Sequence, residues 1–422
     1  MGQALDRKQF LTRTGVALGA VAGFSLLEDV SEAQEEVLRD WTAVRRLFRL
    51  EPGVIHLGSF LLASHPEPVR KAIGRHRRAL DANPVDYLHG RWPANEAAVL
   101  AAAARYLRGR PEDIALTDST TMGLSLLYAG LDVRAGQELL TSTHDFFVTH
   151  ESLDAKAARA GATVRKVALY DRPETASESS IVERVVSAIT PKTRVLALTW
   201  VHSSTGVKLP IRRIATAIEP LNASRGEADR IIFCVDGVHG FGVEDASVAG
   251  LGCDFFATGC HKWLFGPRGT GLVWGSPGAW PAANPTIPSF TGTGTPGNSN
   301  SPGGFHSFEH RWALAEAFAL HRRIGRPRIA SRIHGLNRQF KEGLAAMPHV
   351  RLHTPRAAAL SAGLVCFDVG SLSPETVVRR LRDRRIVATV SPYSTPYVRV
   401  APSILNSSGE IRRTLDVIRR LR

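Results

Sequence analysis

Cysteine is scarce in this chain of 422 residues, which contains only four. They are Cys234, Cys253, Cys260 and Cys366, and each stands in or beside an apolar stretch. Their positions do not repeat the short spacings of metal ligands, and a chain of this length can bury a core that needs no disulfides. We therefore expect four buried thiols, no metal site and no disulfide framework.

A long apolar run is also missing near the N-terminus, where GVALGAVAGFSLL is too short to span a bilayer as a helix. The run follows Arg7-Lys8 and precedes Ser31-Glu32-Ala33, a layout typical of an export signal. The RK-x-FL stretch resembles a twin-arginine signal with lysine as its second basic residue. We expect residues 1–33 to direct the protein to the periplasm, with no stable membrane span after their removal. The alternative is a cytoplasmic protein with an amphipathic N-terminal helix.

Acidic side chains are outnumbered, since 53 Lys and Arg face 39 Asp and Glu and the formal charge is +14. Such a balance can indicate nucleic-acid or anionic-surface binding. The basic residues are scattered over helical stretches such as EIRRTLDVIRRLR, and no nucleic-acid motif accompanies them. We expect no nucleic-acid partner, and we assign the charge to solvated helix faces and to an anionic cofactor or substrate.

The stretch from Ile231 to Gly275 carries the candidate chemistry. It contains two buried strands, IIFCVDG and DFFATG, each bounded by turn residues. Asp236 ends the first strand, His239 follows three residues later, and Lys262 comes after the second strand. Because ligands of open α/β sheets bind outside the carboxyl ends of the strands, these side chains should converge. A lysine that forms a Schiff base and an aspartate that pairs with a pyridinium nitrogen are what pyridoxal phosphate (PLP) chemistry requires.

Two motifs in this stretch, DGVHGFG and GCDFFATGCHKWLFGPRGTG, resemble the signature of the class V aminotransferase family of fold-type I PLP enzymes. The resemblance runs from about residue 50 to the end. Within the family, the chain is similar to the isopenicillin N epimerase-like branch. It implies an α/β fold in which a large domain with a mostly parallel seven-stranded sheet precedes a smaller C-terminal α/β domain. It also implies a homodimer, because active sites of this fold type are shared between subunits.

Four segments are expected, the first from its export-signal layout and the others from this resemblance. Residues 1–33 form the export signal, 34–65 an N-terminal segment, 66–308 the large PLP-binding domain, and 309–422 a linking helix with the small domain. Local patterns add detail: Asn83-Pro84 and the HGRWP stretch predict a loop up to Pro93, and Phe308 should open a long helix.

The resemblance also implies roles for individual residues around the cofactor. Thr120 and Thr121 should hold the phosphate at the start of a helix, where free N–H groups favour an anion. His144 should stack on the pyridine ring, with Phe146 as the alternative. The remaining positions are Asp236 at the ring nitrogen, His239 at the phenolic oxygen, His261 beside the cofactor, Lys262 as catalytic lysine, and Arg399 at the substrate α-carboxylate.

Three departures from the family pattern affect what the site can do. Ser203 stands where the family usually has the asparagine that binds the phenolic oxygen, which makes His239 the better candidate for that bond. Arg311-Trp312 replaces a Gly-Thr pair whose threonine reaches the phosphate in the neighbouring subunit, and Arg311 is a hypothetical substitute. The loop IVATVSPYSTPYVRV contains no cysteine, whereas a desulfurase carries its reactive thiol there.

These features predict a PLP enzyme that acts on an amino acid or an amino-bearing peptide. Transaminase-type chemistry in the periplasm is the first expectation, and it includes pyoverdine-type peptide modification. An epimerase or racemase is one alternative. A catalytically silent PLP- or peptide-binding relative is another, although the presence of Lys262, Asp236 and Arg399 together argues against silence.

Overall fold

A computed structural model describes residues 38–290 and 294–421 of the chain. The export signal expected at residues 1–33 lies outside the described residues, so it stays a prediction. None of the described helices is both long enough and apolar enough to cross a membrane.

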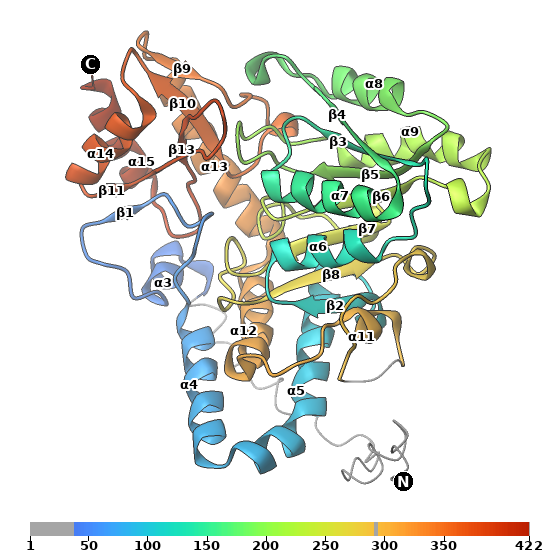
Figure 1. Ribbon diagram of the computed structural model, residues 1–422. Coiled ribbons are helices and arrows are strands. Elements are labelled where there is room, and N and C mark those ends of the chain that lie inside the picture. Colours follow the sequence, from blue (N-terminus) through green and yellow to red (C-terminus); the bar gives the residue numbers. More distant parts are fainter. Residues whose placement is uncertain (1–37, 291–293, 422) are drawn as a thin grey trace, which may run out of the picture.

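The large domain is built on one seven-stranded sheet (Figure 1). Its strands, in spatial order, are β2 (Ile114–Thr117), β8 (Gly271–Gly275), β7 (Phe255–Gly259), β6 (Ile232–Asp236), β5 (Thr193–Thr199), β3 (Glu138–Ser142) and β4 (Thr163–Val167). All run parallel except β8, which pairs antiparallel with both of its neighbours. The mostly parallel seven-stranded sheet expected from the sequence is therefore confirmed.

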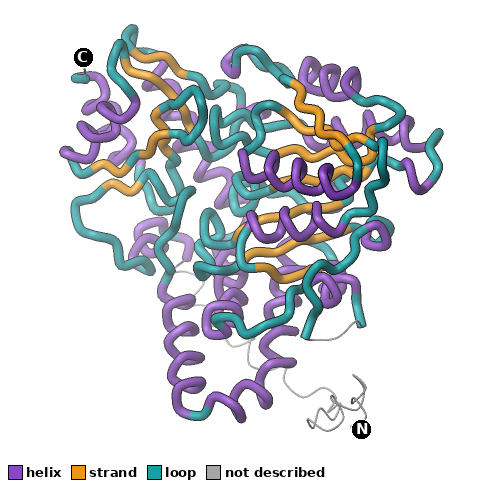
Figure 2. The backbone as a smooth tube through the Cα atoms, in the orientation of Figure 1, coloured by secondary structure: helices purple, strands orange, loops and turns teal. Residues whose placement is uncertain are grey.

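Helices cover both faces of this sheet (Figure 2). Side chains of a strand alternate between its faces, so Ile232 and Cys234 of β6 pack against α6 (Thr120–Gly130) and α7 (Phe147–Ala160). Phe233 and Val235 point to the other face, toward α8 (Glu178–Ala188), α9 (Ile211–Ala223) and α12 (Phe308–Ile324). Burial on both faces explains why central strands such as β6 and β7 are mostly apolar.

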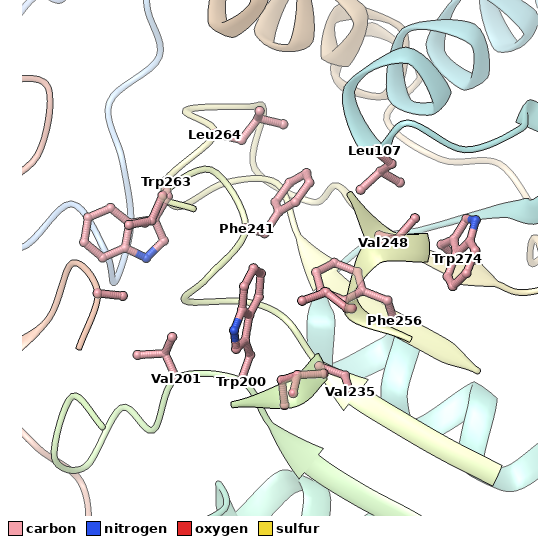
Figure 3. Packing of buried hydrophobic residues seen from close by; sticks show 14 of the residues in the cluster. Leu107, Trp200, Val201, Val235, Phe241, Val248, Phe256, Trp263, Leu264 and Trp274 are labelled. Atoms are coloured by element: carbon pink, nitrogen blue, oxygen red, sulfur yellow. The ribbon is translucent and has the colours of Figure 1, made fainter. Parts of the chain in front are cut away.

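Aromatic packing holds the turn that follows β6 (Figure 3). The Phe256 ring lies 6.2 Å from Trp200 and 6.3 Å from Phe241, measured between ring centroids. A Cβ atom at Gly237 would stand 1.9 Å from the Phe256 ring, and one at Gly240 would stand 2.1 Å from the Trp200 ring. The two glycines of the DGVHG motif are therefore required by close packing.

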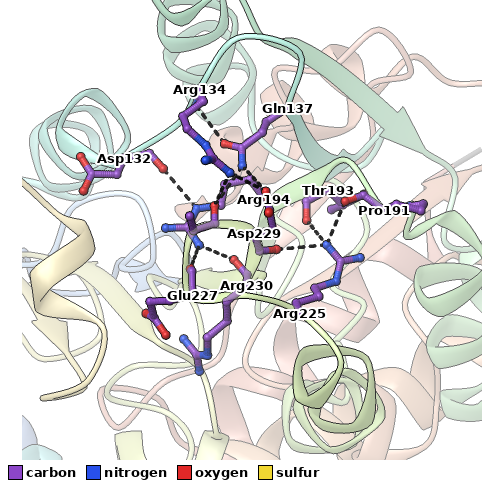
Figure 4. Close-up of polar contacts among 11 residues, drawn as sticks. Asp132, Arg134, Gln137, Pro191, Thr193, Arg194, Arg225, Glu227, Asp229 and Arg230 are labelled. Carbon is purple, nitrogen blue, oxygen red and sulfur yellow. Dashed lines mark hydrogen bonds and ion pairs between the residues drawn. The ribbon is translucent and has the colours of Figure 1, made fainter.

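Arginines organise the loops at the amino ends of the strands (Figure 4). Arg194, which is 4% exposed, donates to the backbone oxygens of Asp132, Glu227 and Arg230 at 2.6 to 3.1 Å. Arg225 donates to the carbonyl oxygen of Thr190 at 2.7 Å. These contacts stabilise one end of the sheet and leave the opposite, carboxyl ends for the site.

A helical arm leads away from the sheet, with α4 (Glu67–Ala82) and α5 (Pro84–Leu107) packed on α12 (Figure 1). The loop predicted up to Pro93 is wrong, because α5 begins at Pro84 and continues through Pro93. Pro84 occupies the first turn, where its missing N–H costs nothing. Trp92 packs on Phe308 at a centroid distance of 4.9 Å, and such tertiary contacts outweigh the bond lost at Pro93. The helix expected from Phe308 is confirmed.

The C-terminal part forms a smaller α/β unit, as expected. Its antiparallel sheet has the order β12 (Thr389–Val390), β13 (Val398–Val400), β10 (Val365–Val369), β9 (Val350–Leu352), and its helices are α13 (Arg326–Ala345), α14 (Pro374–Asp383) and α15 (Ser408–Arg419). Strand β1 (Ile55–His56) pairs in parallel with β11 (Ile386–Val387), so the N-terminal segment packs against this unit. Shorter helices are α3 (Trp41–Arg46), α10 (Val248–Leu251) and α11 (Pro296–Asn300).

Candidate active site

A cavity of about 250 Å³ lies where the carboxyl ends of β3, β5, β6 and β7 meet the small domain. Every residue predicted for the site lines it. These residues are Thr120, Thr121, His144, Asp236, His239, His261, Lys262 and Arg399. The fold thus brings together side chains from both domains, although their individual roles stay predictions.

Asp236 is the last residue of β6 and is buried. One carboxylate oxygen accepts a hydrogen bond from the backbone N–H of Val238 at 3.0 Å, and no cation within the described residues forms an ion pair with it. Burial raises the pKa of this carboxyl to about 6. A protonated pyridine nitrogen would supply the cation that this carboxylate lacks.

Lys262 stands on a tight loop after β7. The backbone N–H of Phe265 donates to the Lys262 carbonyl at 3.0 Å, and that of Gly266 donates to the Cys260 carbonyl at 2.8 Å. Phe265 has a φ of 58°, a left-handed conformation that is costly for a residue with a side chain, and such strain is common at functional sites. Burial, helped by the nearby charge of Arg399, lowers the pKa of the Lys262 amine to about 8. A useful fraction of the amine is therefore neutral and able to act as nucleophile or base.

His239 has a defined hydrogen-bonding role in the cavity wall. The indole N–H of Trp263 donates to Nδ1 of His239 at 3.3 Å, so the ring proton is assigned to Nε2. Burial, with the charges of Lys262 and Arg399, holds the pKa of His239 far below its usual value and keeps the ring neutral. Nε2 is then a donor, as the predicted bond to a phenolic oxygen requires.

The start of α6 lies at one end of the cavity. Ser119 caps the helix by accepting from the backbone N–H of Met122 at 3.1 Å. Thr120 Oγ1 and His261 Nδ1 are both buried without a hydrogen-bond partner. They face each other across Gly259, since a Cβ there would lie 2.9 Å from the first atom and 3.3 Å from the second. Two unpaired polar groups at a helix N-terminus fit a phosphate.

His144 forms part of a ring stack. It lies parallel to Tyr170, with centroids 3.8 Å apart and an angle of 5° between the planes, and its Nε2 accepts from the backbone N–H of Leu169 at 3.2 Å. Burial lowers the pKa of His144, so the ring is neutral. Phe146 also lines the cavity, but it packs edge-on against Tyr393 at 6.0 Å. The parallel stack favours His144 over Phe146 as the partner of a planar ring.

Arg399 brings an unbalanced positive charge into the cavity. It is 5% exposed and donates to Thr389 Oγ1 at 3.3 Å, to the Ser203 carbonyl at 3.1 Å and to the Val390 carbonyl at 3.3 Å. Its guanidinium also lies over the Phe60 ring at 5.0 Å. All of these partners are uncharged, and among the described residues no carboxylate pairs with Arg399. A buried guanidinium with only neutral partners fits a substrate carboxylate.

Several residues in the cavity wall or bonded to it were not identified from the sequence. Asp145 is buried and accepts from Ser142 Oγ at 2.6 Å and from the backbone N–H of Thr199 at 2.6 Å, which joins the loops after β3 and β5. The hydroxyl groups of Tyr393 and Ser203 lie 2.7 Å apart. Tyr393 belongs to the IVATVSPYSTPYVRV loop, and no local pattern in the sequence indicates that it reaches the cavity.

Arg311 contacts another residue of this chain, outside the cavity. It forms an ion pair with Glu96 at 2.8 Å and does not line the cavity. Its suggested contact with a phosphate of a neighbouring subunit stays a prediction. The four cysteines are buried and free, as expected, and none of them lines the cavity.

Comparison with known proteins identifies the family. The profile described as Aminotransferase class-V matches residues 65–399. This chain belongs to that family. The resemblance noted from the two motifs is therefore confirmed, and so is the expectation of a PLP-dependent fold.

Among curated relatives, the isopenicillin N epimerase of Streptomyces clavuligerus is 27% identical, over 90% of this chain and 98% of its own length. The corresponding epimerase of Amycolatopsis lactamdurans is 26% identical over 90% and 98%. A cysteine desulfurase of Klebsiella pneumoniae is 25% identical over 92% and 98%. The chain is thus similar along its length to enzymes of different activities.

Solved structures agree on the fold. A variant of C-DES with glycine covalently linked to its PLP cofactor has a TM-score of 0.81 at 22% identity, covering 89% of this chain and 99% of its own. The cysteine desulfurase of Thermococcus onnurineus has a TM-score of 0.78 at 21% identity, with 90% and 97% covered. At these identities the likeness is one of fold.

We predict that Asp236→Asn makes the cofactor-free protein more stable at neutral pH. Burial raises the pKa of Asp236 from 3.8 to about 6, so between these values the native state holds a proton that the unfolded chain has lost. Wild-type stability therefore falls as pH rises through this window and stays lower above it. The variant should be more stable by about 3 kcal/mol at pH 7.5, and the difference should shrink to less than about 1 kcal/mol near pH 4.

Urea unfolding at pH 4.5, 6 and 7.5 measures this difference. Asp81→Asn serves as the control because Asp81 is an exposed carboxyl outside the cavity. A stability gain at Asp236 that did not change with pH would contradict the prediction.

Proposed function

We propose that this chain is a PLP-dependent enzyme that removes the Cα proton of an amino acid or an amino-bearing peptide. The observation that carries the proposal is the joint placement of Lys262, Asp236 and Arg399 in one cavity. Bound PLP acts as an electron sink that makes the Cα proton of an attached amine acidic. The protein's own groups hold the cofactor, orient the substrate and move the proton.

The cavity offers a partner to each part of the cofactor. Thr120, Thr121 and His261 surround the end that fits a phosphate, and the ring of His144 suits the flat face of a pyridine. Asp236 would keep the ring nitrogen protonated, and His239 would donate from Nε2 to the phenolic oxygen.

Substrate binding and proton removal then follow from two side chains. Arg399 would take the α-carboxylate, because its planar guanidinium matches two oxygens and has no charged partner of its own. Lys262, whose pKa is lowered to about 8, would accept the Cα proton on Nζ. The carboxylate contact fixes the orientation in which the amine and Cα face Lys262.

The outcome at Cα separates the candidate reactions. Transaminase-type chemistry was the first expectation from the sequence. The two relatives named isopenicillin N epimerase, which align over nearly their whole length, support epimerisation as the second candidate. Cysteine desulfurase activity is disfavoured because a thiol must accept the sulfur and no cysteine lines the cavity.

We predict that the purified protein binds PLP with a visible absorption band that depends on Lys262. Lys262→Ala should lose the band of the lysine-bound cofactor, and amino acids that change the wild-type spectrum should no longer do so. Lys71→Ala, a change at an exposed lysine that pairs with the neighbouring Glu67, is the matched control. Absorption spectra with and without a panel of amino acids test this. A colourless wild-type protein that PLP cannot reconstitute would contradict the proposed enzyme and favour a catalytically silent binding protein.

A second prediction concerns Arg399. Arg399→Met should weaken the binding of α-amino acids by about 2 kcal/mol, roughly thirtyfold, because the carboxylate loses charged hydrogen bonds. The corresponding amines without the carboxylate should bind both proteins alike. Spectral titration of paired ligands, with exposed Arg384→Met as control, measures the difference. Equal weakening for acids and amines would show general damage to the site and contradict the assignment.

Two further expectations about the protein in the cell stay predictions. We propose that residues 1–33 direct export to the periplasm. Fractionation of cells that express the full chain tests this: protein in the periplasm supports export, and protein in the cytoplasm contradicts it. We also propose a homodimer, which light scattering measures. Exposed apolar side chains at the cavity, such as Leu61 at 55% exposure, support a partner there.

A further inference from the structure

Tyr393 lies in the cavity wall and has no part in the function proposed above. It belongs to the small domain, on the loop between β12 and β13, and its ring meets the edge of Phe146. Its hydroxyl group lies 2.7 Å from Ser203 Oγ, in the large domain. The phenol is thus aimed and held by a contact that crosses between the domains.

The hydroxyl stays protonated at neutral pH. Burial raises the pKa of Tyr393, and the positive charge of Arg399 opposes this increase. A buried phenol next to a guanidinium can donate a proton and leave a phenolate that the guanidinium stabilises. Tyr393 therefore has a proton to donate at neutral pH and a nearby positive charge that stabilises the phenolate left behind.

The strand order separates Tyr393 from Lys262. In the sheet, β7 is followed by β6, β5 and β3. Lys262 follows β7, and Asp236 ends β6. The contacts of Tyr393 are Ser203, which follows β5, and Phe146, which follows β3. The amine and the phenol thus enter the cavity from opposite sides of the strand that carries Asp236.

Ser203 links the phenol to the substrate-binding arginine. Its carbonyl oxygen accepts from Arg399 at 3.1 Å, while its hydroxyl contacts Tyr393. A carboxylate bound at Arg399 would therefore lie on the same side of the cavity as the phenol. Cα, which is bonded to that carboxylate, would then lie near the phenol. One serine fixes both groups relative to each other.

We propose that Tyr393 delivers a proton to Cα from the side opposite Lys262, so that the enzyme inverts the configuration of an amino-acid centre. The inference rests on the proposed function and selects epimerisation among its outcomes. As the Cα–H bond breaks, its proton passes to Nζ of Lys262. The O–H bond of Tyr393 breaks as the new C–H bond forms on the other side. Lys262 then releases a proton to solvent and the phenolate takes one up, which restores both groups without an oxidant or reductant.

The test compares wild type with Tyr393→Phe in D₂O, with PLP bound and with L- and D-amino acids as probes. NMR follows deuterium at Cα, and chiral chromatography follows configuration. Wild type should form the opposite enantiomer, and this product should carry deuterium at Cα from its first appearance because the phenol proton exchanges with solvent. The variant should retain the visible band and amino-acid affinity, exchange Cα hydrogen with retention through Lys262, and lose inversion by about a hundredfold or more.

Tyr397→Phe is the matched control. It removes a hydroxyl from the same loop, but Tyr397 stacks on His353 at 3.9 Å and does not line the cavity, so inversion should be unchanged. Inversion by Tyr393→Phe at the wild-type rate, or exchange in wild type without any inversion, would overturn the role of Tyr393 and leave the proposed function intact. A wild-type protein with neither a spectral response nor exchange would overturn the proposed function, and this inference with it.

Discussion

Parallel pairing of β3, β5, β6 and β7 is the constraint on which the site depends. Parallel strands all end at the same edge, so the residues that follow them must meet there. His144, Ser203, Asp236 and Lys262 reach one cavity for this reason, although they are far apart in the chain. The close packing of Gly237 on Phe256 then fixes how the chain turns away after Asp236.

The cavity concentrates charge that the protein does not neutralise by itself. Asp236 and Arg399 are buried, and neither forms an ion pair within the described residues. Such groups cost stability unless a ligand supplies the opposite charge. A protonated ring nitrogen and a substrate carboxylate would do so, and binding them would stabilise the folded state by mass action. Thr120 Oγ1 and His261 Nδ1, buried without a hydrogen-bond partner where α6 begins, would likewise gain a partner from a bound ligand.

The small domain contributes two of the side chains that line the cavity. Arg399 and Tyr393 both come from this domain, and both contact Ser203 of the large domain. Ser203 therefore links the two domains through its hydroxyl group and its carbonyl oxygen. The relative placement of the two domains controls the site as much as the residues do.

Much could be predicted from the sequence, because local patterns reflect local physics. The buried strand that ends at Asp236, the strand that precedes Lys262 and the helix that begins at Thr120 all followed from motifs. The loop predicted up to Pro93 failed because contacts of Trp92 and its neighbours with α12 override a single proline. Propensity is a weak guide wherever tertiary packing contributes more.

By itself, the sequence determined the family and the dependence on PLP, since both are carried by short contiguous motifs. Only the tertiary structure decided which tyrosine reaches the cavity, that His144 rather than Phe146 presents a stacked ring, and that Arg311 pairs with Glu96. These contacts join segments that are distant in the chain, and their geometry is set by how strands, helices and domains pack together. No local pattern records such distances.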